Sequence, residues 1–257
     1  MDFILYGTKN RVATITLNRP DKRNALNSTM VMELDKAFKK ADQDRDVKVI
    51  ILKANGDAFC AGADLAYLKE LSDFTYEENL ADSLQIKEMF RQIYTMNKVV
   101  IAQVEGHAIA GGAGLATVCD LVFSVPQAKF GFTEVKIGFV PAIVSVFAIR
   151  KFGESHTKRM LLSGNLIEAN EAKGIGLVNF ISASESIDRD VRKYADNLVT
   201  KTSANSLALT KNLIVEIQQL DLEQALLYAA ELNAKARDSD DCKKGISSFL
   251  KKEKIVW

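Results

Sequence analysis

The 257-residue sequence predicts an α/β fold with mostly parallel sheets, and three observations support this class. Short β-branched runs recur in the first half of the chain, at residues 12–17, 47–52, 99–104 and 121–125. Glycine-bearing turns and helical stretches follow two of these runs, which is the order of β–α units with right-handed crossovers. From about residue 190 the strand signals end, and only amphipathic helical patterns remain.

The N-terminal part of the chain supplies the first strand and the first long helix. Residues 12–17 alternate like a strand, which Asn18-Arg19-Pro20 ends. Asn27 or Ser28 can cap the helix that follows. Its apolar residues recur at helical spacing, namely Met30, Leu34, Ala37 and Phe38.

Two turns rich in small residues lie where a strand should give way to a helix. The first is Phe59-Cys60-Ala61-Gly62-Ala63-Asp64, and the second covers residues 106–114. Small residues after a buried strand let free backbone N–H groups approach a ligand at a helix N-terminus. Two such groups aimed at one oxygen would form an oxyanion hole. The alternative is that both turns only close β–α units.

Three longer helices are expected outside these units. A charged helix covers about residues 76–97, and amphipathic helices cover residues 207–217 and 222–236. No proline-rich or low-complexity linker precedes the last two. On periodicity alone, they would complete the core of one protomer.

The composition excludes several classes of protein. A net charge of +1 gives no global attraction to nucleic acid. The three cysteines are far apart and form no CxxC pair, which argues against a disulfide framework and a zinc site. Cys60 lies in the first turn but has no adjacent base, so we expect a packing residue and not a nucleophile. No spacing of His, Asp and Glu suggests a metal site.

The sequence predicts a cytoplasmic protein. No apolar run approaches the roughly 20 residues that cross a membrane. The first residues lack the basic segment and the long apolar segment of a signal peptide. They also lack the Arg- and Ser-rich composition of a transit peptide.

Six short motifs occur in a fixed order along the chain: Thr14-Ile15-Thr16-Leu17-Asn18-Arg19-Pro20, Asn24-Ala25-Leu26-Asn27, Phe59-Cys60-Ala61-Gly62-Ala63-Asp64, Cys119-Asp120, Ala169-Asn170-Glu171-Ala172 and Gly245-Ile246-Ser247-Ser248-Phe249-Leu250. In order and spacing they resemble the enoyl-CoA hydratase/isomerase (crotonase) family. The resemblance implies a ClpP/crotonase-like spiral of repeated ββα units in residues 1–195, with the acyl-CoA site. It implies a C-terminal helical trimerisation region in residues 196–257, and a homotrimer or a hexamer made of two trimers.

The resemblance also implies catalytic roles. The oxyanion donors would be the backbone N–H groups of Ala63 and Gly111. A typical hydratase of this family has two catalytic glutamates, and their positions correspond here to Gly114 and Glu134. One glutamate is therefore absent, and we expect Gly114 to leave space where its side chain would lie. Burial would raise the pKa of Glu134, because apolar residues flank it in the sequence: Phe130, Phe132, Val135, Ile137 and Val140.

The substrate would be an acyl-CoA thioester, and no separate cofactor is expected because coenzyme A is part of the substrate. Lys22 and Arg23 match the region that receives the CoA phosphates. The remaining residues expected at the substrate are Ala25, Ala61, Asp64, Leu65 and Gly114. For Asp64 and Asp120 a structural role is favoured, as a helix cap in the case of Asp64. Neither His107 nor His156 has the partners of a hydrolase triad.

The favoured activity is hydration of a 2-enoyl-CoA with a branched or carboxylated acyl group, such as 3-methylglutaconyl-CoA in leucine degradation. Ile143 and Val144 replace a glycine-rich stretch of typical hydratases and imply a reshaped acyl pocket. One alternative is a Δ3,Δ2-enoyl-CoA isomerase with Glu134 as the single proton shuttle. A second, from another class, is an RNA-binding protein, although the chain shows no interleaving of basic and aromatic residues.

Overall fold

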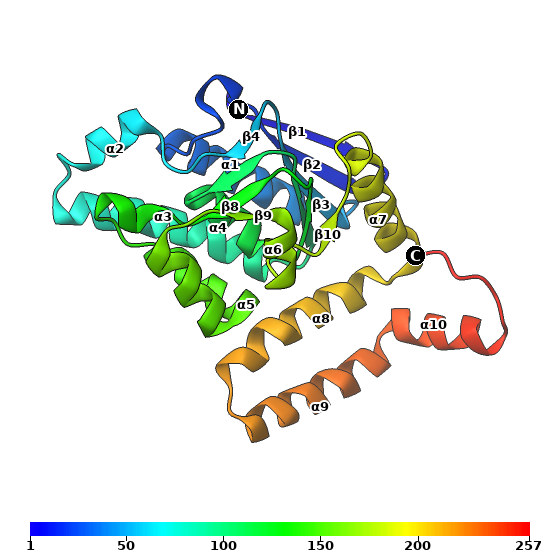
Figure 1. The fold of residues 1–257 in the computed structure, drawn as a ribbon. Coiled ribbons are helices and arrows are strands. Elements are labelled where there is room, and N and C mark those ends of the chain that lie inside the picture. The colour runs from blue at the N-terminus through cyan, green and yellow to red at the C-terminus, as the bar shows by residue number, and fades with distance from the viewer.

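The computed structural model describes residues 1–257, and its strands form two sheets (Figure 1). The larger sheet has six strands in the order β1-β2-β3-β5-β7-β10, and only β1 runs antiparallel to its neighbour. The expected α/β class with mostly parallel strands is therefore confirmed. The strands of this sheet are β1 (Ile4–Lys9), β2 (Val12–Leu17), β3 (Val49–Ala54), β5 (Val99–Val104), β7 (Leu121–Ser124) and β10 (Phe180–Ile181).

The smaller sheet explains the ββα repeat. Its strands are β4 (Ala58–Cys60), β6 (His107–Ile109), β8 (Lys129–Gly131) and β9 (Ile167–Glu168). The first three are parallel, and β9 is antiparallel to β8. Each of β4 and β6 follows a long strand of the larger sheet after a tight turn and leads to a helix. The repeat is thus strand, short strand and helix, whereas periodicity alone had indicated one strand per unit.

Helices cover the sheets on several sides. α7 (Ile187–Lys201) packs across β2, β3, β5 and β7, and α1 (Ser28–Gln43) packs against β1, β2 and α3. Asn27 caps α1 by accepting a hydrogen bond from the N–H of Met30, as expected. The remaining helices before residue 200 are α2 (Leu65–Leu71), α3 (Tyr76–Thr95), α4 (Gly111–Val118), α5 (Ala142–Ser163) and α6 (Ala169–Gly174), with 3-10 turns η1 (Pro20–Lys22) and η2 (Glu134–Ile137). None of the helices combines the length and apolarity that a membrane crossing requires.

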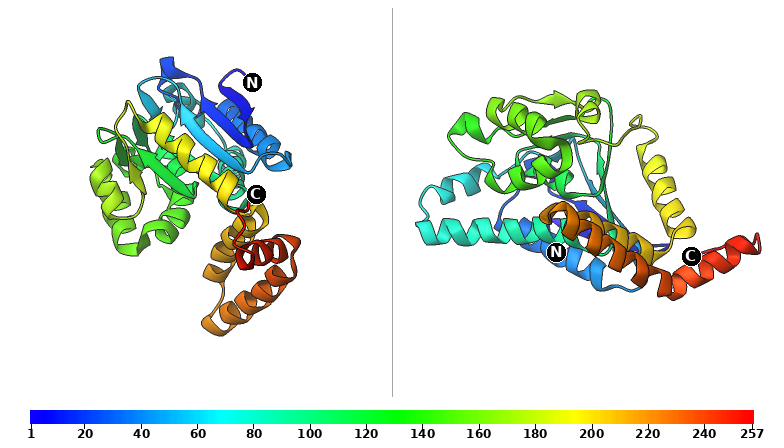
Figure 2. Two further views of the ribbon diagram at one scale, coloured as in Figure 1. Left: turned by 90° about the vertical axis from the view of Figure 1, so that its right-hand side faces the viewer. Right: turned by 90° about the horizontal axis from the view of Figure 1, so that it is seen from below.

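The last three helices project away from the body of the molecule (Figures 1 and 2). We call residues 204–250 the C-terminal arm; it consists of α8 (Ala204–Glu216), η3 (Ile217–Gln219), α9 (Leu222–Asp238) and α10 (Asp240–Leu250). The boundary expected at residues 195/196 falls inside α7, whose Ala195 and Val199 are buried in the core.

One lysine anchors the arm to the body. Lys211 on α8 is 7% exposed, and its Nζ donates to Asp120 Oδ2 at 2.8 Å. The same Nζ donates to the carbonyl oxygens of Ile93 (3.1 Å) and Lys98 (3.0 Å). Asp120 also accepts from the N–H of Val100. Asp120 is thus structural, as the sequence predicted.

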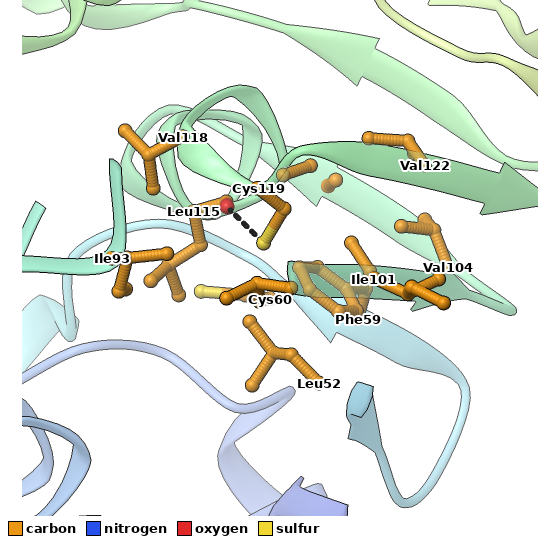
Figure 3. Close-up of a cluster of buried hydrophobic side chains, with 14 of the residues drawn as sticks. Leu52, Phe59, Cys60, Ile93, Ile101, Val104, Leu115, Val118, Cys119 and Val122 are labelled. Atoms are coloured by element: carbon orange, nitrogen blue, oxygen red, sulfur yellow. Dashed lines mark hydrogen bonds between the residues drawn. The ribbon is translucent and has the colours of Figure 1, made fainter. Parts of the chain in front are cut away.

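The core between these elements contains two thiols (Figure 3). Cys60 and Cys119 lie among apolar side chains of β3, β5, α4 and neighbouring elements, and Cys119 Sγ donates to the Leu115 carbonyl at 3.2 Å. Burial raises the pKa of each thiol to about 12. Because a thiolate is the nucleophilic form, Cys60 is a packing residue and not a nucleophile.

Candidate active site

The two small-residue turns lie in contact with each other. Because β4 pairs in parallel with β6, the turns that follow these strands emerge side by side. Gly62 has φ +95°, and a Cβ at this position would lie 3.0 Å from Ala110 Cβ and 3.3 Å from the Ile109 carbonyl oxygen. Glycine is therefore required here both by the backbone conformation and by the close approach of the second turn.

Each turn presents backbone N–H groups without a protein acceptor, and those of Ala63 and Gly111 are among them. Ala63 and Gly111 donate to no acceptor, whereas their neighbours are bonded: Asp64 N–H to Leu26 O (2.8 Å) and Ala110 N–H to Gly131 O (2.7 Å). Gly111 is the first residue of α4, so its N–H also carries the partial positive charge of a helix N-terminus. Two free donors on adjoining turns are the arrangement that an oxyanion hole needs.

The second turn holds a strained residue. Ala110 has φ +49° and ψ −118°, a conformation that costs a non-glycine residue about 1–3 kcal/mol. Its N–H bond to Gly131 and its contact with Gly62 fix the residue in place. Such strain occurs where the surrounding structure over-determines the backbone, which is frequent at functional sites.

A buried polar network supports the first turn. Asn24 is fully buried; its Oδ1 accepts from Arg19 N–H (2.8 Å), and its Nδ2 donates to the carbonyl oxygens of Asn55 (2.9 Å) and Ala58 (2.8 Å). Arg19 Nη1 lies 2.5 Å from Asp64 Oδ2. Neither Arg19 nor Asn24 was expected at the site from the sequence. The sequence signal that could have identified Asn24 is its residue type. Asn24 adopts φ +54°, a conformation that asparagine tolerates better than most residues.

Asp64 ends this network as a helix cap. Its Oδ1 accepts from the N–H groups of Ala66 (2.8 Å) and Tyr67 (3.4 Å) at the start of α2. Burial alone would raise the pKa of Asp64, but the hydrogen bonds from Arg19 and from the two N–H groups together hold it below its usual value. Asp64 therefore stays ionised at neutral pH, and the structural role favoured for it is confirmed.

Glu134 begins η2, three residues after Gly131, which bonds to Ala110. Its Oε2 is buried and has no hydrogen-bond partner. Burial raises the pKa of Glu134 and outweighs a hydrogen bond from its own backbone N–H. Part of the expected environment was wrong: Phe130 and Phe132 are fully buried, but the other three flanking apolar side chains, Val135, Ile137 and Val140, are exposed.

The structure corrects the expectation that Gly114 leaves free space. A Cβ at Gly114 would lie 2.6 Å from Val144 Cγ1 and 2.9 Å from Phe90 Cε2. Val144 comes from α5 and Phe90 from α3, so two elements distant in sequence close this position. The place of the absent glutamate is filled by apolar side chains.

The residues expected at the CoA moiety lie beside the first turn. Lys22 and Arg23 are exposed and form no ion pair, and the Arg23 carbonyl accepts from the N–H of Ala61 at 3.0 Å. Ala25 is buried, and Leu65 at the start of α2 is 83% exposed. The structure thus brings the 22–25 segment and the 61–65 turn together.

The two histidines form no second catalytic site. His107 Nδ1 accepts from Lys129 N–H (3.2 Å), and His156 is exposed on α5, so no hydrolase triad is assembled. No group of three or more His, Cys, Asp or Glu side chains is placed to hold a metal ion.

The fold and the paired turns define a crotonase-type α/β protein, and comparisons with known proteins give the family. The enoyl-CoA hydratase/isomerase family model matches residues 7–257. A Thermus thermophilus protein named "Putative enoyl-CoA hydratase" is 42% identical over 244 residues, which are 95% of this chain and 96% of that protein. Crotonyl-CoA hydratase of Syntrophomonas wolfei is 33% identical, covering 98% and 96%. A crystal structure of enoyl-CoA hydratase from Mycobacterium smegmatis superposes with a TM-score of 0.94 at 30% identity, covering 99% and 98%. The chain belongs to the enoyl-CoA hydratase/isomerase family.

Proposed function

We propose that the protein hydrates a 2-enoyl-CoA thioester. The observation that carries the proposal is the pair of unbonded N–H groups, at Ala63 and Gly111, on two turns in contact. The buried, unpartnered carboxylate oxygen of Glu134 supplies the acid–base group that such a site needs. The names of the Thermus and Syntrophomonas relatives support the same activity.

In the proposed mechanism the thioester oxygen accepts hydrogen bonds from Ala63 and Gly111. Negative charge develops on this oxygen as water adds to Cβ, and the two donors stabilise the resulting enolate. Glu134 takes a proton from the attacking water and later gives a proton to Cα. A pKa raised by burial suits a group that acts first as base and then as acid. The reaction needs no cofactor, because coenzyme A is part of the substrate.

For the acyl group we propose a branched or carboxylated chain, such as 3-methylglutaconyl. Phe90 and Val144 occupy the place of a second carboxylate, so Glu134 has no acidic side chain beside it to orient the water. Backbone groups, or a carboxylate on the substrate itself, would then help Glu134 to hold the water. The exposed Lys22 and Arg23 are proposed to bind the CoA phosphates.

The filled position at Gly114 also favours a second candidate, a Δ3,Δ2-enoyl-CoA isomerase. Isomerisation moves a proton from Cα to Cγ and needs one base but no water. A single buried glutamate beside an oxyanion hole is sufficient for this reaction.

A small panel of CoA thioesters in D2O tests the proposal and separates the candidates. With the wild-type enzyme, we expect weak hydration of crotonyl-CoA and stronger hydration of 3-methylglutaconyl-CoA, followed by mass spectrometry of the 3-hydroxyacyl product. Glu134→Gln should lower kcat by at least about 100-fold, within the range for a general acid–base group. Glu185→Gln, on an exposed loop, is the matched control and should retain activity. A wild-type enzyme that shifts a 3-enoyl double bond but hydrates no 2-enoyl thioester would establish the isomerase.

We also propose that the protein forms a homotrimer or a hexamer of two trimers through its C-terminal arm. The arm leaves large apolar side chains more than half exposed, at Leu222, Leu226, Leu227, Ile246, Phe249 and Leu250. Extensive exposed apolar surface is typical of a protein–protein interface. Contact with another copy of the chain would remove this surface from water.

A further inference from the structure

A basic cavity lies at the amino ends of strands in the larger sheet, on the side opposite the candidate active site. Arg11, Lys48 and Lys98 immediately precede β2, β3 and β5, which are adjacent and parallel. Val12 pairs with Val49 and Val49 with Val99, so the three cations lie level at the amino ends of these strands. The turns of the candidate active site follow β4 and β6 of the smaller sheet, which come after the carboxyl ends of β3 and β5. The cavity and the candidate active site therefore lie at opposite ends of these strands.

The cavity has a volume of about 310 Å³ and no acidic lining residue. Arg45, from the loop between α1 and β3, is the fourth cation in its wall, and the first turn of α8 closes one side. The other lining residues are Val47, Asn97, Ala204, Asn205, Ala208, Leu209 and Asn212.

None of the four cations forms an ion pair. Lys48 is 3% exposed, and its Nζ donates to the carbonyl oxygens of Val199 and Thr202. Lys98 Nζ likewise donates to two carbonyl oxygens, those of Asp44 and Val47. Carbonyl oxygens satisfy two of the three N–H groups of each ammonium and fix its position, but they do not neutralise its charge.

The two arginines retain further donors. Arg11 donates from Nε to the Asp46 carbonyl (3.4 Å) and from Nη1 to the Trp257 carbonyl (3.1 Å), which leaves its Nη2 unused. Arg45 makes no hydrogen bond or ion pair with the protein. A guanidinium with free N–H groups is suited to bidentate contact with a phosphate or carboxylate.

Three carboxylates lie near the cavity but do not line it: Asp42 and Asp44 favour the charged form of Lys98, and Asp241 favours that of Lys48. Asp44 accepts from the N–H of Asp46, and Asp241 accepts from the hydroxyl of Ser203. Burial and the neighbouring Arg11 lower the pKa of Lys48 to about 8, despite the opposing effect of Asp241. Loss of hydration on burial, together with the charge of Arg11, makes the ammonium of Lys48 less stable than that of a free lysine.

We propose that this cavity binds a small anion of the phosphate class. The first turn of α8 adds to the field of the four cations, because the N–H groups of a helix N-terminus favour anions. An anion in the cavity would place negative charge among the four cations, where no lining residue is acidic. The site is separate from the CoA region proposed for Lys22 and Arg23, so its occupancy does not depend on the proposed function.

Calorimetric titration with inorganic pyrophosphate tests the proposal, with CoA present at saturation so that the CoA site is blocked. We expect saturable binding of one pyrophosphate per chain, measured against sodium chloride of equal ionic strength. Arg45→Gln should raise the Kd about tenfold, since a charge-assisted hydrogen bond is lost. The fold should be unaffected, because Arg45 makes no hydrogen bond within the protein.

A second variant reverses the charge without disturbing α8. Asn205→Asp places a carboxylate in the cavity wall near the N-terminus of α8, where it also suits the helix dipole. We expect this variant to lose pyrophosphate binding while its Tm is unchanged or raised. Lys36→Gln removes one exposed charge on α1 outside the cavity and should leave the Kd unchanged. The proposal is overturned by an absence of saturable binding, by a Kd that neither Arg45→Gln nor Asn205→Asp changes, by an equal effect of Lys36→Gln, or by binding that saturating CoA abolishes.

Discussion

At the scale of single residues, the burial that raises the pKa of Glu134 also lowers the free energy of unfolding at neutral pH. Burial raises the pKa of this carboxyl above the unfolded value of about 4.3. The folded state therefore binds the proton more tightly than the unfolded state does. It follows that the free energy of unfolding decreases as the pH rises from about 4 through the folded-state pKa.

Glu134→Gln should remove this dependence, because glutamine resembles the protonated acid at every pH. We expect the Tm of the variant minus that of the wild type to be small near pH 4 and to increase toward pH 7. Thermal unfolding followed by circular dichroism at several pH values measures this difference. Glu185→Gln, on an exposed loop, should show no such trend. A Tm difference for Glu134→Gln that is independent of pH would contradict the account.

Gly114 differs from Glu134 in that its role is steric. Because a Cβ would lie 2.6 Å from Val144 and 2.9 Å from Phe90, Gly114→Ala should overpack the core. The expected loss is about 1–3 kcal/mol of unfolding free energy in a urea titration. Gly7→Ala is the control, since a Cβ at Gly7 meets no atom within 4 Å. Gly114→Glu should consequently destabilise the protein and not restore a two-carboxylate site. Unchanged stability of Gly114→Ala would show that Val144 and Phe90 move aside freely.

At the scale of elements, the sequence predicted the long strands and helices better than the short ones. The runs at β2 and β5 and the helical stretches at α1, α8 and α9 were recognisable because their periodicity extends over several residues. β4, β6 and β8 have three residues each, too few for alternation to be visible, so they were included in the turns.

The candidate active site could be predicted from the sequence only in part. The direction of the Glu134 pKa shift agrees with expectation, although three of the five apolar residues that flank it in the sequence are exposed. The closure of the Gly114 position could not be predicted in this way. It depends on contacts from α3 and α5, which only the packed fold brings together.

The start of α4 allows a sharp test of the oxyanion hole. Gly111 is the first residue of the helix, a position that tolerates proline because its N–H has no intrahelical partner. Gly111→Pro should remove the proposed donor and lower kcat by about 100- to 1,000-fold, but it also restricts the backbone of the strained Ala110 that precedes it. Gly111→Ala keeps the N–H and should remain active, because its Cβ meets only the end of the flexible Leu26 side chain. If a folded proline variant keeps full kcat, another group must polarise the thioester.

At the scale of the whole molecule, the C-terminal arm projects away from the body (Figure 2), and its exposed large side chains give it an apolar surface that a single protomer does not cover. Phe249, at 82% exposure, lies on α10 near the end of this surface. Contact with another protein chain is the usual way in which such apolar surface is removed from water.

Phe249→Glu should therefore shift the protein toward a smaller species, because a carboxylate would lose hydration at the interface. Size-exclusion chromatography with light scattering, at several protein concentrations, measures the molar mass. Glu231→Gln, an exposed position on α9, is the control and should leave the mass unchanged. A wild-type mass of one chain at all concentrations would refute assembly through the arm.

The ion pair between Lys211 and Asp120 connects the arm to the body at a specific point. Asp120 lies two residues beyond the end of α4, whereas Gly111 begins the same helix. At 1.5 Å per residue, the eight residues of α4 span about 12 Å. One short helix thus connects the anchor point of the arm with the proposed thioester-binding donor. A shift of the arm would act on Asp120 through Lys211, and α4 connects Asp120 with the Gly111 N–H.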